Sequence, residues 1–153
     1  KYSETTLYIF ANREAIKNLC KDESLEIIDQ NDYIYLHPRV SQKELAIEFM
    51  KSDVWLYPTD FEETYCITAV EAMAAGALCA AVSIGSLITV IGNKGILVDG
   101  DIRDDRVKDK MLKKLFCVLD RAKIKENYIR KGFEFAKSQN IDKIIRTWKQ
   151  ILI

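Results

Sequence analysis

The sequence is poor in the residues that bind metals or act as acid–base catalysts. It has one histidine, His37, among 153 residues, and its cysteines form no CxxC pair. The four cysteines lie far apart in apolar surroundings: Cys20, Cys66, Cys79 and Cys117. A zinc site needs a cluster of such ligands, and a Ser-His-Asp or Cys-His hydrolase needs a histidine beside its nucleophile. We therefore expect no metal, reduced and mostly buried thiols, and a cytoplasmic location.

The chain also lacks a long hydrophobic run and a net charge. No apolar segment approaches the roughly 20 residues of a membrane span, and 23 basic side chains balance 23 acidic ones. The balance is uneven, because residues 1–100 carry a net charge of −7 and residues 101–153 a net charge of +7. A basic region can bind nucleic acid or an anionic membrane, but Lys-rich helices with a solvated face are the commoner explanation. No aromatic-basic pattern of an RNA-binding module accompanies this charge, so we expect no nucleic-acid partner.

Short apolar runs alternate with segments of helical periodicity. The runs predict strands within residues 5–11, 32–40, 54–58, 77–82 and 95–100, and the periodic segments predict helices within residues 13–29, 41–53, 67–75 and 106–153. Ser41 and Glu44 have the spacing of a capping box, and Gly76 is placed to end a helix. Apolar strands that alternate with helices form parallel sheets covered on both faces. The sequence thus predicts an α/β fold, a doubly wound, Rossmann-like parallel sheet of about five strands with a helical carboxyl-terminal extension, in a single domain over residues 1–153.

Three apolar stripes on the expected helices predict the core. The first is Leu45, Phe49 and Met50; the second is Val107, Met111, Leu115, Val118 and Leu119; the third is Ile141, Ile144, Ile145, Trp148 and Ile151. Residues at these spacings share one side of a helix. We expect all three stripes to face the interior, with Trp148 as the anchor of the last.

One carboxylate stands alone in the most apolar part of the chain. Glu71 is the only charged residue from Thr64 to Asn93, and a lone buried carboxylate is costly unless a partner meets it. The helix that contains it begins near Cys66, directly after a strand, so its unpaired N–H groups face the crevice where ligands bind in such sheets. Glu63 precedes that helix. The two carboxylates could frame a diphosphate, with a ribose near Glu71 and a second sugar near Glu63; a structural carboxylate at Glu71, bonded to a backbone amide or to Arg39, is the alternative.

The segment SDVWLYPTDFEETYCITAVEAMAAGALCAA resembles the donor-binding segment of the retaining, nucleotide-sugar-dependent glycosyltransferases of the GT-B fold, the group 1 family. Glu63 and Glu71 stand at the Glu-x7-Glu spacing of that family, and the residues after Glu71 match its AMAxG block. The strand and proline before Glu63 and the GILV block near residue 96 follow in the family's order. The resemblance extends over about residues 5–150.

The resemblance implies roles for individual residues. Glu63 would be the catalytic residue, which contacts hydroxyls of the transferred sugar and stabilises an oxocarbenium-like transition state. Glu71 would bind the ribose. The remaining nucleotide-sugar contacts would come from the backbone amides of Thr64, Tyr65 and Cys66, from the base-lining loop at Arg39 and Val40, and from the small-residue turn at Gly85. The resemblance implies a hexosyltransferase without a cofactor or metal, because that fold neutralises the diphosphate with a helix dipole and basic side chains.

The chain also departs from the family pattern. Thr64 stands where a glycine is usual, and the segment from Gly85 to Thr89 lacks the family's acidic residue. A first strand with a basic pair would precede Lys1, and an amino-terminal acceptor-binding domain would complete the enzyme. We therefore expect residues 1–153 to be a truncated carboxyl-terminal half that binds the nucleotide-sugar donor and is inactive alone. A peripheral membrane contact through the missing domain stays open, as does the alternative of a non-catalytic nucleotide-binding or partner-binding domain of the same fold.

Overall fold

The computed structural model describes residues 5–19 and 22–152 and consists of two compact units. Unit 1 covers residues 1–45 and unit 2 covers residues 46–153, so the division falls within helix α3 (Gln42–Lys51). Each unit is described by itself below. The expectation of a single domain over residues 1–153 stays a prediction.

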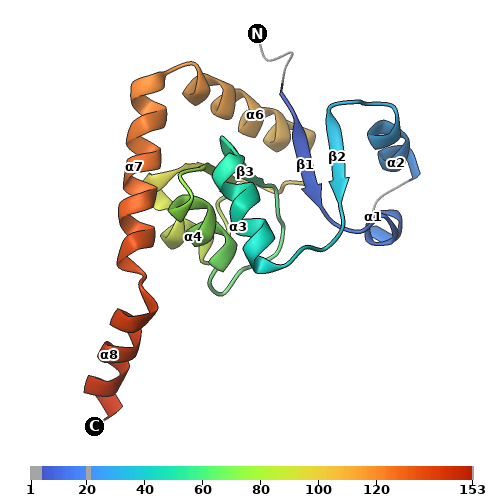
Figure 1. Ribbon diagram of the computed structural model, residues 1–153. Coiled ribbons are helices and arrows are strands. Elements are labelled where there is room, and N and C mark those ends of the chain that lie inside the picture. The colour runs from blue at the N-terminus through green and yellow to red at the C-terminus, as the bar shows by residue number, and fades with distance from the viewer. Residues whose placement is uncertain (1–4, 20–21, 153) are drawn as a thin grey trace. The chain divides into compact units, whose positions relative to one another are not determined.

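Unit 1 contains two parallel strands, which are joined by two short helices and followed by the start of α3. Strand β1 (Leu7–Phe10) lies beside β2 (Ile34–His37), in a register that pairs Tyr8 with Tyr35 (Figure 1). The helix expected at residues 13–29 is divided into α1 (Arg13–Leu19) and α2 (Asp22–Asp29). Ile16 of α1 is buried, and the expectation of a buried thiol at Cys20 lies outside the described residues.

The predicted capping box begins helix α3. The Ser41 backbone N–H donates to Glu44 Oε2 at 2.8 Å, and the Glu44 backbone N–H donates in return to Ser41 Oγ at 3.3 Å. These bonds satisfy two donors that the first turn leaves unpaired. Leu45 is half-buried and Phe49 is buried, but Met50 is 65% exposed. The assignment of Met50 to the inward stripe was therefore wrong, because it lies about 100° around the helix from Phe49.

The core of unit 2 is a parallel sheet of three strands. Strands β3 (Val54–Tyr57), β4 (Leu78–Val82) and β5 (Ile96–Val98) lie in the order β3-β4-β5. All five residues of β4 are buried, because this strand has a neighbour on each side and helices on both faces. The α/β class with parallel, Rossmann-like strands is thus confirmed. Its five strands belong to two sheets, since the described backbone bonds join β1 only to β2.

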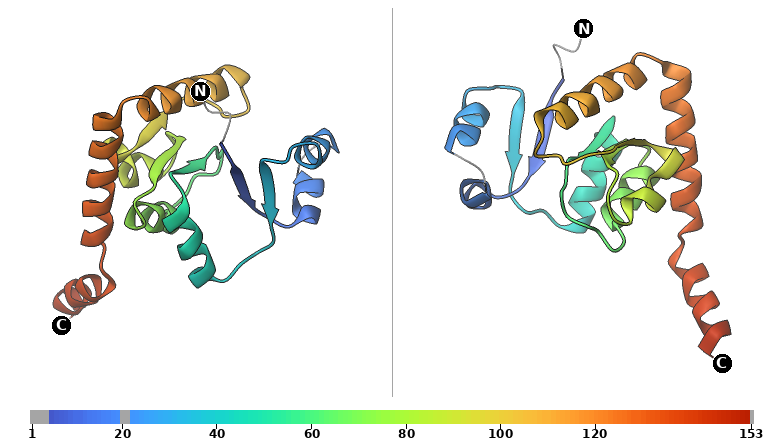
Figure 2. Two further views of the ribbon diagram at one scale, coloured as in Figure 1. Left: turned by 45° about the horizontal axis from the view of Figure 1, so that its top comes forward. Right: turned by 180° about the vertical axis from the view of Figure 1, so that it is seen from behind.

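Most helices of unit 2 bury apolar residues around this sheet. They are α4 (Ile67–Ala74), α5 (Leu87–Val90), the 3₁₀ turn η1 (Gly92–Lys94), α6 (Asp105–Leu119), α7 (Ala122–Ser138) and α8 (Ile141–Leu152). The second stripe is confirmed: Met111, Leu115 and Val118 are buried, and Val107 and Leu119 pack against the same cluster. Figures 1 and 2 show α7 alongside α4, and a Cβ atom at Gly132 of α7 would lie 3.0 Å from Met73 Cγ of α4. Glycine at this position therefore permits the close approach of the two helices.

Helix α8 does not pack into the core. Figure 2 shows it leading away from the end of α7, and its whole apolar stripe is solvent-exposed, from 37% at Ile144 to 71% at Ile151, with Trp148 at 57%. The expectation that this stripe faces the interior, anchored by Trp148, was wrong. Helical spacing shows which side chains share a face, but it does not show that another element covers that face.

The thiols also differ from one another. Cys66 and Cys79 are buried, as expected, whereas Cys117 of α6 is exposed, and all three are free. In the described part of the chain, no helix is long and apolar enough to cross a membrane.

Candidate functional site

The loop between β3 and α4 holds Glu63 by both its side chain and its backbone. The Tyr57 hydroxyl donates to Glu63 Oε1 at 2.8 Å. The Ser86 backbone N–H donates to the Glu63 carbonyl at 2.9 Å, and the Glu63 N–H donates to the Phe61 carbonyl at 3.1 Å. Glu63 is half-buried. Its carboxylate therefore has a fixed position at the carboxyl end of β3, where ligands of parallel α/β sheets bind.

Gly85 lies directly against the backbone of Glu63. Its φ of +51° is in the left-handed region, and a Cβ atom there would lie 2.9 Å from the Glu63 carbonyl oxygen. Only glycine fits such a position without strain. The structure thus brings together two residues that are separated by 22 positions in the sequence, Glu63 and Gly85. Beside them, the buried Ser86 Oγ has no hydrogen-bond partner among the described residues.

Helix α4 begins without a side-chain cap. Cys66 is the N-cap residue and its side chain bonds no backbone N–H of the first turn; its Sγ lies 3.3 Å from Thr68 Oγ1 instead. Cys66 is buried, while Thr64 and Tyr65 just before it are exposed. The first N–H groups of a helix have no intrahelical acceptor and carry the positive end of the helix dipole. The start of α4 can therefore accept an anion.

Glu71 lies one turn further along α4 and is half-buried. The buried face of this helix is formed by Ala69, Ala72 and Met73, whereas Ile67, on the same side as Glu71, is 61% exposed. The apolar surroundings expected for Glu71 thus lie mainly on the opposite side of the helix. Among the described residues, the fully buried set contains no polar or charged residue.

Arg39 and Val40 follow strand β2 and belong to unit 1, whereas the other predicted site residues belong to unit 2. Arg39 is exposed and Val40 is half-buried. In the described part of the chain, no group of three or more His, Cys, Asp or Glu residues is arranged to hold a metal ion.

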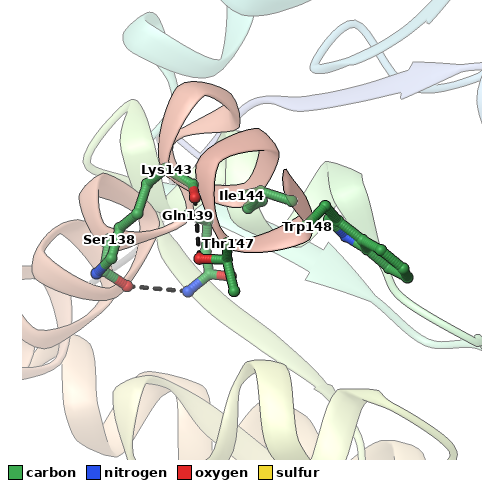
Figure 3. Close-up of a pocket in the computed structure, with 6 residues that line it drawn as sticks. All are labelled: Ser138, Gln139, Lys143, Ile144, Thr147 and Trp148. Carbon is green, nitrogen blue, oxygen red and sulfur yellow. Dashed lines mark hydrogen bonds between the residues drawn. The ribbon is translucent and has the colours of Figure 1, made fainter. Parts of the chain in front are cut away.

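A shallow pocket lies beyond these residues, between the end of α7 and α8. Its volume is about 290 Å³, and its lining residues in Figure 3 are Ser138, Gln139, Lys143, Ile144, Thr147 and Trp148. Ser138 Oγ accepts a hydrogen bond from Gln139 Nε2 at 2.9 Å. None of the predicted site residues lines the pocket, but the Tyr65 hydroxyl donates to Gln139 Oε1 at 3.0 Å. This bond ties the loop before α4 to the end of α7.

Sequence reasoning missed three residues of this region: Tyr57, Ser86 and Gln139. Tyr57 ends β3, and a polar side chain at the carboxyl end of a strand is a signal that could have identified it. Ser86 directly follows Gly85 and could have been included with it. Gln139 is 74 positions from Tyr65, and no sequence pattern indicates that they meet.

The fold and this arrangement define a doubly wound, Rossmann-like α/β protein. Residues 1–115 match the family described as glycosyl transferases group 1. The chain therefore belongs to the group 1 glycosyl transferases, and the predicted family is confirmed. A search of curated proteins gave no match.

Solved structures share the fold at low sequence identity. Sucrose-phosphate synthase from Thermosynechococcus elongatus has a TM-score of 0.74 at 17% identity, over 96% of this chain and 37% of that one. The pneumococcal O-GlcNAc transferase GtfA, in complex with UDP and GlcNAc, has a TM-score of 0.67 at 18% identity, over 95% and 28%. The catalytic domain of starch synthase IV from Arabidopsis thaliana, bound to ADP and acarbose, has a TM-score of 0.62 at 17% identity, over 84% and 28%. These are GT-B glycosyltransferases, and the chain spans well under half the length of each.

Proposed function

We propose that this chain is the donor-binding part of a glycosyltransferase that uses a nucleotide-diphosphate sugar and transfers a hexose with retention of configuration. The observation that carries the proposal is the start of α4, where an N-terminus without a side-chain cap follows the fixed carboxylate of Glu63. An anion and a polyhydroxylated group can be bound side by side there, because the amides attract the diphosphate and the carboxylate accepts hydrogen bonds from sugar hydroxyls.

Each residue has a distinct role in this proposal. The backbone amides of Thr64, Tyr65 and Cys66 bind the diphosphate, and Glu71 accepts hydrogen bonds from the ribose hydroxyls. Glu63 binds the transferred sugar and stabilises the positive charge that develops at its anomeric carbon when the bond to the diphosphate breaks. Gly85 keeps the Glu63 backbone in place.

The complete reaction needs more protein than these residues. The chain covers 37% of sucrose-phosphate synthase and 28% of GtfA, which supports the interpretation that an acceptor-binding domain and the basic residues that grip the diphosphate lie in the rest of a longer protein. We infer that the chain alone binds the donor weakly and transfers no sugar. We also infer that donor binding requires no metal or other cofactor. A cytoplasmic location, with any membrane contact made through the missing domain, accords with this proposal.

Ligand-observed NMR with UDP, GDP and ADP, each alone and as its hexose conjugate, tests the proposal. UDP and ADP belong in the panel because GtfA and starch synthase IV have been solved with them. We expect one nucleotide to bind, Glu71→Gln to weaken it by about 1–3 kcal/mol, and Mg²⁺ or Mn²⁺ to change its affinity little. Glu63→Gln should leave the free nucleotide unaffected and weaken only its sugar conjugate.

Three results would refute this function. They are the absence of binding by any of the six ligands, a strict metal requirement, and sustained sugar transfer by the chain alone, which would contradict its incompleteness. If the nucleotide binds but its hexose conjugate gains nothing from Glu63, a non-catalytic nucleotide-binding domain is the better description.

A further inference from the structure

Tyr57 contacts the Glu63 carboxylate and is not among the predicted site residues. Its hydroxyl donates to Glu63 Oε1 at 2.8 Å in partly buried surroundings. Its ring stacks on Trp55, two residues earlier on the same side of β3, with centroids 4.9 Å apart and planes 26° from parallel. The phenol is thus held by a strand and by an aromatic neighbour, so its oxygen has a defined position.

The other contacts of Glu63 hold its backbone, so the bond from Tyr57 is the one that orients its side chain. Ser86 and Phe61 hold the backbone of Glu63 through its carbonyl and its N–H, and Gly85 packs against that backbone without a side chain. None of these contacts limits rotation of the Glu63 side chain. The bond from Tyr57 does, because it fixes Oε1 and leaves Oε2 to accept hydrogen bonds from a ligand.

The phenol stays protonated, and so remains a hydrogen-bond donor, at neutral pH. Burial, and then the hydrogen bond to Glu63, raise the pKa of Tyr57 above its ordinary value near 10. A protonated phenol can donate to the carboxylate but cannot compete with it for sugar hydroxyls as a second anion. This chemistry suits a residue that orients a carboxylate rather than one that binds the ligand itself.

We propose that Tyr57 is a positioning residue for the transferred sugar, which orients the Glu63 carboxylate through its hydroxyl and so favours the hexose conjugate over the free nucleotide. The inference rests on the proposed function. Preorganised groups bind more tightly because less conformational freedom is lost on association. Tyr57 therefore affects discrimination between two ligands and not the binding of the nucleotide.

The alternative is that the bond only stabilises the loop of residues 58–66. A loop loosened by loss of the hydroxyl would also disturb the amides of Thr64 to Cys66. Binding of the nucleotide and of its hexose conjugate would then weaken together, and the melting temperature would fall. The two explanations thus differ in the ratio of two affinities.

Tyr57→Phe removes only the hydroxyl and keeps the ring on Trp55. We expect it to weaken the hexose conjugate about threefold to tenfold, the worth of one hydrogen bond, and to leave the nucleotide within about twofold. The ligands are UDP, GDP and ADP and their hexose conjugates, measured by NMR titration, with thermal denaturation in parallel. Tyr128→Phe is the matched control, since Tyr128 lies half-buried on α7 against the core cluster and outside the site.

The same substitution in the Glu63→Ala variant distinguishes the positioning role from a structural one. In Glu63→Ala, Tyr57→Phe should have no further effect on the hexose conjugate, because the group that it orients is gone. An equal loss for both ligands, an unchanged ratio, or the same loss in the Glu63→Ala background would overturn the positioning role while leaving the proposed function intact. If the wild-type chain binds no nucleotide, or Glu63→Ala does not weaken the conjugate, the proposed function fails and the inference fails with it.

Discussion

Replacement of Gly85 by alanine tests whether the backbone of residues 62–63 keeps its position only because residue 85 has no side chain. The new methyl group would lie 2.9 Å from the Glu63 carbonyl oxygen and 3.0 Å from the Glu63 nitrogen. Both are backbone atoms, which cannot move aside as the end of a flexible side chain can. Because Glu63 is also bonded to Ser86, the residue after Gly85, the methyl group must push apart two segments that a hydrogen bond holds together.

The expected loss has two parts. An alanine in the left-handed region, at the φ of +51° that Gly85 has, costs about 1–2 kcal/mol. Weakening of the bond between the Ser86 N–H and the Glu63 carbonyl adds about 1 kcal/mol. A total of about 2–3 kcal/mol corresponds to a fall of roughly 4–12 °C in the melting temperature of a chain of this size. The hexose conjugate should also bind more weakly, because the Glu63 carboxylate moves with its backbone.

Gly76→Ala is the matched control. Gly76 also has a positive φ, +87°, but nothing lies within 4 Å of the position of its Cβ. It should therefore show the conformational cost without the steric one, and donor binding should be unchanged. Circular dichroism melting curves measure the stability of both variants, and NMR titrations measure their affinity for the hexose conjugate. If Gly85→Ala melts no lower than Gly76→Ala and binds the hexose conjugate as the wild type does, the steric argument is refuted.

Two further predictions concern the thiols and α8. Burial, with a smaller effect from Cys66, raises the pKa of Cys79 from 9.0 to about 12, so its contribution to stability is complete below pH 9 and is lost as the pH rises toward 12. The free energy of unfolding in urea should therefore fall above pH 9, and fall less steeply in Cys79→Ala. Deletion of residues 141–153 removes only exposed side chains among those described, so the melting temperature should change by no more than about 2 °C, and binding of the dye ANS should decrease; a large loss of stability would contradict the exposed position of α8.

The sequence predicts most of the local structure, because local structure depends on short-range physics. Ser41 and Glu44 form their capping box from residues three positions apart. The five buried residues of β4 come from one uninterrupted apolar run. Met111, Leu115 and Val118 lie at helical spacing and are buried together.

Predictions fail where a distant part of the chain decides the outcome. The stripe of α8 has as clear a period as that of α6, yet only the stripe of α6 is covered by the sheet. The sequence shows that Glu71 is the only charged residue of its segment. It does not show which side of α4 packs inward, and that decides how buried Glu71 is. The contact of Gly85 with Glu63, and the bond between Tyr57 and Glu63, require two loops to meet or a loop to fold back on its strand. Periodicity in the sequence predicts neither of these contacts.

Gly132 has a consequence for how mutations spread their effects through unit 2. Its missing side chain lets α7 approach Met73, and Met73 is on the helix that carries Glu71 two residues earlier. A side chain at position 132 would force the Met73 side chain to shift, although position 132 lies outside the proposed site. In a library of random variants selected for donor affinity, position 132 should therefore tolerate fewer residues than its distance from the ligand suggests.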